Sequence, residues 1–461
     1  MKDPGGAVYV FGISFVASVG GFLFGYDMGI MPGAKLYLGQ QFHLSGDALG
    51  FVTASAVLGA AAGPLLGAWL CDWMGRRRTL IWASLLLAVG AIFTALPRDI
   101  VTFTVFRIVG GVGVGLCSIA SPMFIAEVAP AAKRGALGFM YQMAIVAGFM
   151  ISSLVAWLLA RWLPETTSWR WMFGSEMAAV LIFTAGLLLV PESPRWLATR
   201  GRDEEALAVL ERIGGPEHAR QQIDEIRQSL KEEVGTFAEL FHPGLRMALL
   251  VGILLAIFNN YTGWSGVFYY LPEIFKRGGF PDTVDAIFMY VLSYSFMGVM
   301  TLNACFVVDR LGRRPLWLYG SLVMVAANVL AGLVLHLNVT GWPVLAAICL
   351  MAIPHSFALG PLPWLMMSEL FPTRNRARAV AITTTILWAA AMLPVWAFPR
   401  LGAISESCLG SVGGVFWLYA ILCALSFLFG WKMLPETKGR TLEQIAESWK
   451  RQAASEARSP R

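Results

Sequence analysis

Long apolar stretches alternate with short polar ones along the whole chain. Each apolar stretch is close to the length, about 20 residues, that an α-helix needs to cross a bilayer. The stretches are continuous, without alternation of apolar and polar positions, so they predict transmembrane helices and exclude the strands of a β-barrel. The predicted segments are 8–34, 47–71, 79–96, 101–128, 136–160, 170–190, 246–272, 284–308, 315–336, 343–371, 378–399 and 413–434. The expected fold is an all-α membrane protein with twelve transmembrane helices.

One long polar stretch, about residues 191–245, divides these segments into two groups of six. Within it, residues 203–213 and 219–233 have apolar side chains at helical spacing among charges, and a Gly-Gly-Pro sequence separates them. We predict two short amphipathic helices there; a plain linker is the alternative. The expected organisation is a six-helix bundle in 1–190, linker helices in 191–245, a second six-helix bundle in 246–434 and a tail in 435–461.

Three charged motifs occur once in each half of the chain, in the same order. The pairs are Gly75-Arg76-Arg77 with Gly312-Arg313-Arg314, the ExxPxxxR motifs that begin at Glu127 and Glu369, and Pro191-Glu192 with Pro435-Glu436. Repeated motifs between apolar segments indicate a duplicated membrane protein. Many secondary transporters consist of such repeats and bind their substrate near the middle of the membrane.

The charge distribution favours a membrane over a nucleic-acid partner. Charged residues make up 14% of the chain, compared with roughly 25% in soluble domains. If both termini are cytoplasmic, seven of the 35 Lys and Arg lie in outer loops: Lys35, Arg98, Arg161, Arg170, Lys276, Arg277 and Arg400. Nearly all the others lie in cytoplasmic segments, as the positive-inside rule requires. We therefore expect a plasma-membrane protein with cytoplasmic termini, and the compact outer loops suit a bacterial inner membrane.

The sequence gives no sign of a metal site, a cofactor or an enzyme. The six cysteines are scattered and form no CxxC pair, so neither a zinc site nor a disulfide framework is expected. The glycine-rich sequence after Arg107 follows no strand, so it is not interpreted as a nucleotide-binding loop. We read its glycines as positions where membrane helices approach closely.

Two ionisable residues, Asp27 and Arg107, lie within apolar segments. An unpaired charge there costs at least about 2.5 kcal/mol, so such residues usually face a cavity and pair with each other. We predict that Asp27 binds a coupled proton and that Arg107 tunes this binding; a static ion pair is the alternative. His355 is a third candidate, as a titrating or ligand-binding residue or as a packed core histidine. Glu176 is a further ionisable residue in the sixth apolar segment, and it is assigned no role.

Seven sequence motifs, spread over nearly the whole chain, resemble those of the sugar porter family of the major facilitator superfamily. They are 21–27 (GFLFGYD), 72–78 (DWMGRRR), 107–115 (RIVGGVGVG), 127–135 (EVAPAAKRG), 191–195 (PESPR), 309–315 (DRLGRRP) and 435–439 (PETKG). The resemblance implies two six-helix bundles and alternating access around a central cavity. Proton-coupled members have Asp at the position of Asp27, so the resemblance also implies a proton as a partner.

Charged residues at the predicted cytoplasmic helix ends occur with both signs. Carboxylates paired with Arg can close one face, and such pairs must break when that face opens. The predicted cytoplasmic gate comprises Arg76, Arg77, Glu127, Arg134, Glu192, Arg195, Asp309, Arg313, Arg314, Glu369, Arg376 and Glu436. The alternative, that the charges only set the orientation in the membrane, does not explain the acidic residues.

The resemblance implies a polyol site of amide side chains and tryptophans, because amides match hydroxyls and an aromatic face covers the ring. Gln142, Trp364 and Trp388 match the family pattern. Segment seven departs from it, since Asn259 and Asn260 replace two Gln, Ser265 replaces an Asn, and Trp264 precedes that Ser. In segments eight and eleven, Met297 and Leu387 stand where the family often has amides. The predicted substrate-binding residues are Gln142, Asn259, Asn260, Ser265, Trp364, Trp388 and His355.

We therefore expect a secondary active transporter of a sugar or polyol, a proton symporter and a monomer. The loss of long amides leaves open a less hydroxylated solute, such as a small organic acid. A uniporter is a further alternative, and a non-transporting nutrient sensor is a more remote one.

Overall fold

The computed structural model describes residues 4–130, 133–231, 238–438, 444–445 and 449, without the side chains at 4, 5, 229–231, 243, 244, 305–309, 368, 373 and 374. Within this part, twelve helices are long and apolar enough to cross a membrane. They are Gly6–Gln41, Gly46–Met74, Arg76–Ala95, Ile100–Val128, Arg134–Trp162, Glu165–Leu189, Leu245–Tyr269, Thr283–Ala304, Arg313–His336, Trp342–Met367, Asn375–Leu409 and Gly413–Met433. The predicted all-α fold with twelve membrane segments is confirmed.

Several membrane segments are longer than their apolar cores. Helix α1 (Pro4–Gln41) continues past the predicted end of the first segment, and it includes Lys35, which is fully buried. The prediction that Lys35 lies in an outer loop is therefore wrong. The reason is that Glu273 compensates the charge of Lys35. The helix can therefore continue through a cation at which the apolar pattern of the sequence ends.

Three membrane segments are interrupted helices. The sixth consists of α6 (Glu165–Gly174) and α7 (Glu176–Leu189), and the seventh of α11 (Pro243–Tyr261) and α12 (Trp264–Tyr269). The tenth consists of α16 (Trp342–Pro354), the π-helical turn η3 (His355–Leu359) and α17 (Pro361–Glu369). Pro361 lacks an N–H and cannot continue the helical ladder. Interruptions of this kind are common where a membrane protein binds its ligand.

Contacts divide the chain into two units, and boundaries between them fall inside α1, α2 (Gly46–Met74), α5 (Arg134–Trp162) and α6. The first comprises residues 1–28, 59–152 and 170–234, and the second comprises residues 29–58, 153–169 and 235–461. The four-part organisation predicted from the repeats stays a prediction.

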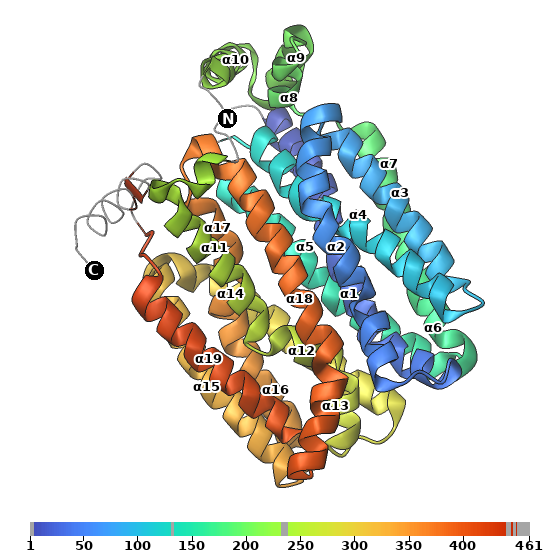
Figure 1. The fold of residues 1–461 in the computed structure, drawn as a ribbon. Helices are drawn as coiled ribbons and strands as arrows, with labels where there is room; N and C mark the ends of the chain where they lie inside the picture. Colours follow the sequence, from blue (N-terminus) through green and yellow to red (C-terminus); the bar gives the residue numbers. More distant parts are fainter. Residues whose placement is uncertain (1–3, 131–132, 232–237, 439–443, 446–448, 450–461) are drawn as a thin grey trace. The chain divides into compact units, whose positions relative to one another are not determined.

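In the first unit, α3 (Arg76–Ala95) packs along α4 (Ile100–Val128) and along α7 (Figure 1). The glycines of α4 permit this packing: a Cβ on Gly113 would meet Ala83 and Leu87 of α3, and one on Gly115 would meet Ala60 and Gly63 of α2 (Gly46–Met74). The linker forms α8 (Pro194–Thr199), α9 (Asp203–Gly214) and α10 (Pro216–Lys231), which pack on one another beyond the ends of α3 and α7 (Figure 1).

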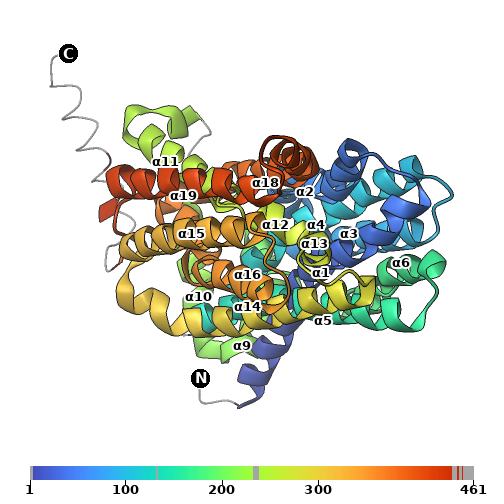
Figure 2. The same cartoon turned by 90° about the horizontal axis from the view of Figure 1, so that it is seen from below.

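In the second unit, α15 (Arg313–His336) lies along α19 (Gly413–Met433) and beside α16 (Figure 2). Helix α11 packs along α18 (Thr373–Leu409), and α13 (Leu271–Arg277) packs on α14 (Thr283–Leu311). The buried Trp317 donates a hydrogen bond to the carbonyl of Ser426 at 3.2 Å. Many large apolar side chains in both units are exposed, such as Leu189 and Trp431. Lipid, rather than water, is the solvent that such surfaces fit.

Candidate functional site

The predicted pair of intramembrane charges forms an ion pair in the first unit. Arg107 on α4 contacts Asp27 on α1 through Nη1 and Oδ1, and its Nη2 donates to the backbone carbonyl of Asp27 at 3.4 Å. Both side chains are buried. The guanidinium also lies 5.2 Å from the ring centre of Phe173. Arg107 is therefore held by an anion and an aromatic ring, away from water.

A second buried carboxylate, Glu176, lies close enough to Asp27 for the two groups to interact electrostatically. Glu176 is the first residue of α7, immediately after the break in the sixth segment. Its Oε1 and the Oδ2 of Asp27 are buried and receive no hydrogen bond from any donor among the described residues. With both carboxylates ionised, the site has one negative charge more than Arg107 neutralises. A proton shared by the two carboxyl groups removes this excess and provides the missing donor.

The sequence pattern did not assign Glu176 a role. The available signal was a single Glu at the start of an apolar run, directly after Ser175. The hydroxyl of Ser175 forms a 2.8 Å hydrogen bond with that of Tyr26, the residue before Asp27. This bond ties the helix break to the part of α1 that holds Asp27.

Gln142 and the two asparagines of segment seven differ in how their amides are used. Gln142 on α5 (Arg134–Trp162) is half-buried and makes no hydrogen bond with a described residue. Asn259, in contrast, donates to the carbonyl of Leu359 at 2.6 Å, and Asn260 donates to the carbonyl of Leu387 at 2.9 Å. Among these amides, Gln142 alone has its donor group available to a ligand.

Ser265 and His355 also have partners within the second unit. Ser265 Oγ donates to Asn260 Oδ1 at 2.7 Å. The ring of His355 stacks on that of Trp264, with ring centres 5.2 Å apart and planes 24° apart. His355 Nδ1 is buried without a hydrogen-bond partner among the described residues. The carbonyl of Leu359, the last residue of the π-helical turn, cannot accept from the residue four positions on, because Pro363 has no N–H. Asn259 supplies the donor instead.

The predicted tryptophans also lie in the second unit. Trp364 is half-buried against Ala256, Met367 and Leu387, and Trp388 is buried. Leu387, which stands where a family amide is common, is thus part of an apolar cluster. Trp364 and Leu387 thus give this part of the second unit an aromatic and apolar character.

The first copy of the repeated motifs forms a network at the start of α3. Arg76 donates to Glu127 Oε1 at 2.8 Å, and the other oxygen of Glu127 accepts from Ser193 Oγ at 2.5 Å. Glu192 Oε1 accepts from the backbone N–H groups of Arg76 at 2.9 Å and of Arg77 at 3.0 Å. Glu192 therefore caps the N-terminus of α3, where a carboxylate also interacts favourably with the helix dipole.

The second copy of the motifs repeats this network. Arg313 donates to Glu369 Oε1 at 3.0 Å, and Glu369 Oε2 accepts from Thr437 Oγ1 at 2.5 Å. Glu436 accepts from the backbone N–H groups of Arg313 and Arg314, each at 3.1 Å. Burial acts to raise the pKa of Glu436, but these hydrogen bonds and one from Lys438 outweigh it and lower the pKa. Each copy thus joins a capped helix start to an Arg–Glu pair.

Backbone conformation explains why each Gly-Arg-Arg motif begins with glycine. Gly75 has φ 100° and ψ 164°, and Gly312 has φ 88° and ψ 161°. Only glycine adopts this region readily. A Cβ at either position would also collide with the capping carboxylate, Glu192 or Glu436.

The described side chains of the remaining members of the predicted gate do not take part in these two networks. Arg134 and Arg195 are exposed and form no ion pair with a described residue. Arg77 donates to the carbonyl of Leu187 at 2.7 Å, and Arg314 to that of Trp431 at 2.6 Å. Arg376 is half-buried, and the side chain of Asp309 lies outside the described part of the structure. No group of His, Cys, Asp and Glu in the described part is arranged to hold a metal ion.

Comparison with known proteins identifies the family. The family model described as "Sugar (and other) transporter" matches residues 13–449. The chain belongs to this family. It is 36% identical to the arabinose-proton symporter of Bacillus subtilis over 449 residues, which cover 96% of this chain and 95% of that protein. It is 35% identical to the D-xylose-proton symporter of Escherichia coli K12, with 96% of each chain covered.

Solved structures show the same fold. The inward open conformation of the xylose transporter XylE from E. coli matches with a TM-score of 0.84 at 33% identity, covering 96% of this chain and 100% of that one. The sugar transporter described here therefore has the fold of the major facilitator superfamily, to which XylE belongs. It is an integral protein of the plasma membrane, since its helices are long and apolar enough to span a bilayer and its relatives are bacterial symporters.

Proposed function

We propose that this transporter couples the uptake of a sugar to the entry of a proton by alternating access. The observation that supports this most directly is the buried cluster of Asp27, Arg107 and Glu176. The cluster holds two carboxyl groups and one guanidinium group in a place from which water is excluded, so the carboxyl pair is suited to binding a proton. The relatives named above as arabinose-proton and D-xylose-proton symporters support the same assignment.

In this mechanism, the carboxyl pair holds the coupled proton. With the proton bound, the cluster is neutral and inexpensive to keep buried; without it, the excess charge favours a state in which water reaches the carboxylates. Arg107 positions Asp27 and limits this excess to one charge. Proton binding thereby changes the balance between the states open to either side.

Gln142 is the residue that we propose to recognise sugar hydroxyls. Its amide has both a donor and an acceptor available, whereas Asn259 and Asn260 are engaged with backbone carbonyls. Trp364 and Trp388 supply aromatic surface for a sugar ring. A less hydroxylated solute is the second candidate, because the amides of segment seven are already occupied.

We further propose that both termini and the repeated networks lie on the cytoplasmic side, where the excess of Lys and Arg places them. The Arg76–Glu127 and Arg313–Glu369 pairs each stiffen the helix ends of their own unit. In the proposed gate, each set of stiffened helix ends moves as a rigid body. The exposed Arg134 and Arg195 make different contacts in the different states.

Transport by purified protein in proteoliposomes tests the proposal. A panel of radiolabelled pentoses, hexoses, polyols and small organic acids is supplied with and without an imposed inward proton gradient. We expect gradient-driven accumulation of a sugar by the wild type. Asp27→Asn and Glu176→Gln should lose accumulation while retaining sugar exchange without a gradient. Accumulation by both variants, or accumulation of acids alone, would contradict the proposal.

A further inference from the structure

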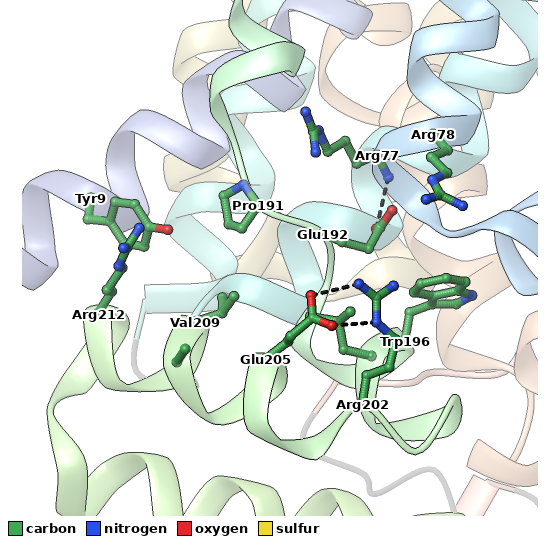
Figure 3. A pocket seen from close by; sticks show the side chains of 12 residues that line it. Tyr9, Arg77, Arg78, Pro191, Glu192, Trp196, Arg202, Glu205, Val209 and Arg212 are labelled. Atoms are coloured by element: carbon green, nitrogen blue, oxygen red, sulfur yellow. Dashed lines mark hydrogen bonds and ion pairs between the residues drawn. The ribbon is translucent and has the colours of Figure 1, made fainter.

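A cavity of about 340 Å³ lies at the end of the first unit, apart from the charge cluster described above. Its walls come from the start of α1, the first turn of α3, and the linker helices α8 and α9 (Figure 3). Arginines dominate its polar lining, with Arg77 and Arg78 from α3 and Arg202 and Arg212 from the linker. Tyr9 lies beside Arg212 at one side of the cavity (Figure 3).

Two of these four arginines have side chains that make no hydrogen bond or ion pair with a described residue. Arg202 is paired with Glu205 through two hydrogen bonds of 2.6 Å each, and Arg77 donates to the backbone carbonyls of Leu187 and Leu188. Arg78 and Arg212 are exposed and form no ion pair with a described residue.

The acidic residues of the cavity do not change this balance. Both carboxylate oxygens of Glu205 accept hydrogen bonds from Arg202. The carboxylate of Glu192 caps the N-terminus of α3. Two free guanidinium groups therefore face a cavity that is large enough for a small polar group. Guanidinium groups bind phosphate through paired hydrogen bonds, so the chemistry fits a phosphate ester.

The surroundings of the cavity favour a lipid as the source of that phosphate. Val8 and Phe11, on either side of Tyr9 along α1, are 72% and 55% exposed. Leu188 and Leu189 of the α7 end, just before the cavity residue Pro191, are 61% and 86% exposed. Apolar side chains thus continue from the cavity along two membrane helices, where acyl chains would lie.

We propose that this cavity binds the headgroup of an anionic phospholipid with a single phosphodiester, such as phosphatidylglycerol. Arg78 and Arg212 bind the phosphate, the Tyr9 hydroxyl donates to it or to the glycerol, and the acyl chains follow α1 and α7. The bound lipid bridges the membrane helices α1 and α3 to the linker helix α9. This site is independent of the transported substrate.

Native mass spectrometry of the detergent-purified full chain tests the proposal, with phosphatidylglycerol and phosphatidylcholine of identical acyl chains. We expect the wild type to retain phosphatidylglycerol at least about tenfold better. The double variant R78Q/R212Q should lose this preference, because it removes the two free guanidinium groups. R78K/R212K should keep part of it, because the charge persists without the planar fork.

The matched control is R98Q/R220Q, which removes two exposed arginines of the same unit that do not line the cavity. It should retain phosphatidylglycerol as the wild type does. Unfolding of R78Q/R212Q without lipid, measured by intrinsic fluorescence, should match the wild type and so exclude misfolding as the cause. Equal retention of both lipids by the wild type, or unchanged retention by R78Q/R212Q, would overturn the proposal. Full competition by inorganic phosphate or deacylated glycerophosphoglycerol would overturn the lipid assignment as well.

Discussion

Replacement of Lys35 by Met should destabilise the second unit strongly. Lys35 is fully buried in α1, with its Nζ 2.5 Å from Glu273 Oε1 of α13 and 3.2 Å from the ring centre of Tyr270. Met has a similar length and no charge, so Lys35→Met removes the cation and keeps most of the volume. The Glu273 side chain, only 26% exposed, then lacks its counter-charge.

The expected loss follows from the difference between breaking a buried ion pair and replacing it. Removal of one partner costs about 3–5 kcal/mol, because the other charge stays buried without compensation. The partial exposure of Glu273 places the loss near the lower end, at about 3 kcal/mol, and the lost contact with Tyr270 adds about 1 kcal/mol. Replacement of both partners should cost far less, since apolar substitutes for buried pairs are often nearly neutral.

A double-mutant cycle measures this difference. Wild type, K35M, E273Q and K35M/E273Q are unfolded in mixed micelles with increasing SDS, and tryptophan fluorescence gives the free energy of unfolding. We expect each single variant to be less stable than the double variant, which requires a coupling energy larger than either single loss, or more than about 4 kcal/mol. The reasoning is wrong if K35M is as stable as the wild type, or if the two single losses simply add in the double variant.

Three further predictions concern helix ends and amides. Gly75→Ala should cost about 1–3 kcal/mol of stability, because the backbone conformation at Gly75 is essentially restricted to glycine. Gly12→Ala, in open space within α1, should cost nothing. Equal melting temperatures of the two variants in detergent would count against this prediction. Asn259→Ala should cost about 1–3 kcal/mol by leaving the carbonyl of Leu359 without a donor, and SDS unfolding that matches the wild type would contradict it. The pKa of Glu436 is lowered in the folded protein, so its carboxylate stabilises the fold at neutral pH, and this contribution is lost as the pH falls below the usual value of 4.5. Glu436→Gln should therefore show a shallower fall in stability between pH 6 and about 3, measured by fluorescence, and an unchanged profile would be evidence against the capping role.

The membrane helices could be predicted from the sequence because apolar length is a local property. The pairing of Asp27 with Arg107 could also be predicted, because both are costly charges in apolar segments. The partners of Lys35 and Glu176 could not, because they are distant in the sequence. Lys35 looked like the end of a segment, but Glu273 allows the helix to continue past it. Glu176 was visible as an acidic residue in an apolar run, yet its contact with Asp27 depends on how α1 and α7 pack. A one-dimensional pattern identifies costly residues without identifying their partners.

The amides of segment seven illustrate a second limit. From the sequence, Asn259 and Asn260 are donors for a sugar, as the corresponding family positions imply. In the structure, both donate to backbone carbonyls, one of which belongs to the π-helical turn that begins at His355. Pro361 and Pro363 mark the irregular backbone in the sequence, but they do not show which side chain satisfies the carbonyls left without a donor. The same residue types therefore have a structural use that the spacing does not reveal.

The distribution of candidate residues constrains how coupling can work. Asp27, Arg107 and Glu176 all belong to the first unit, whereas the substrate candidates other than Gln142 belong to the second. Gln142 is thus the one substrate candidate that shares a unit with the proton site. Proton binding can act on the other candidates through the equilibrium between states of the whole protein. Linkage then requires that proton binding raise sugar affinity by the same factor by which sugar raises proton affinity. The polar contacts of the second unit can consequently change in evolution, and with them the substrate, without disturbing the proton site.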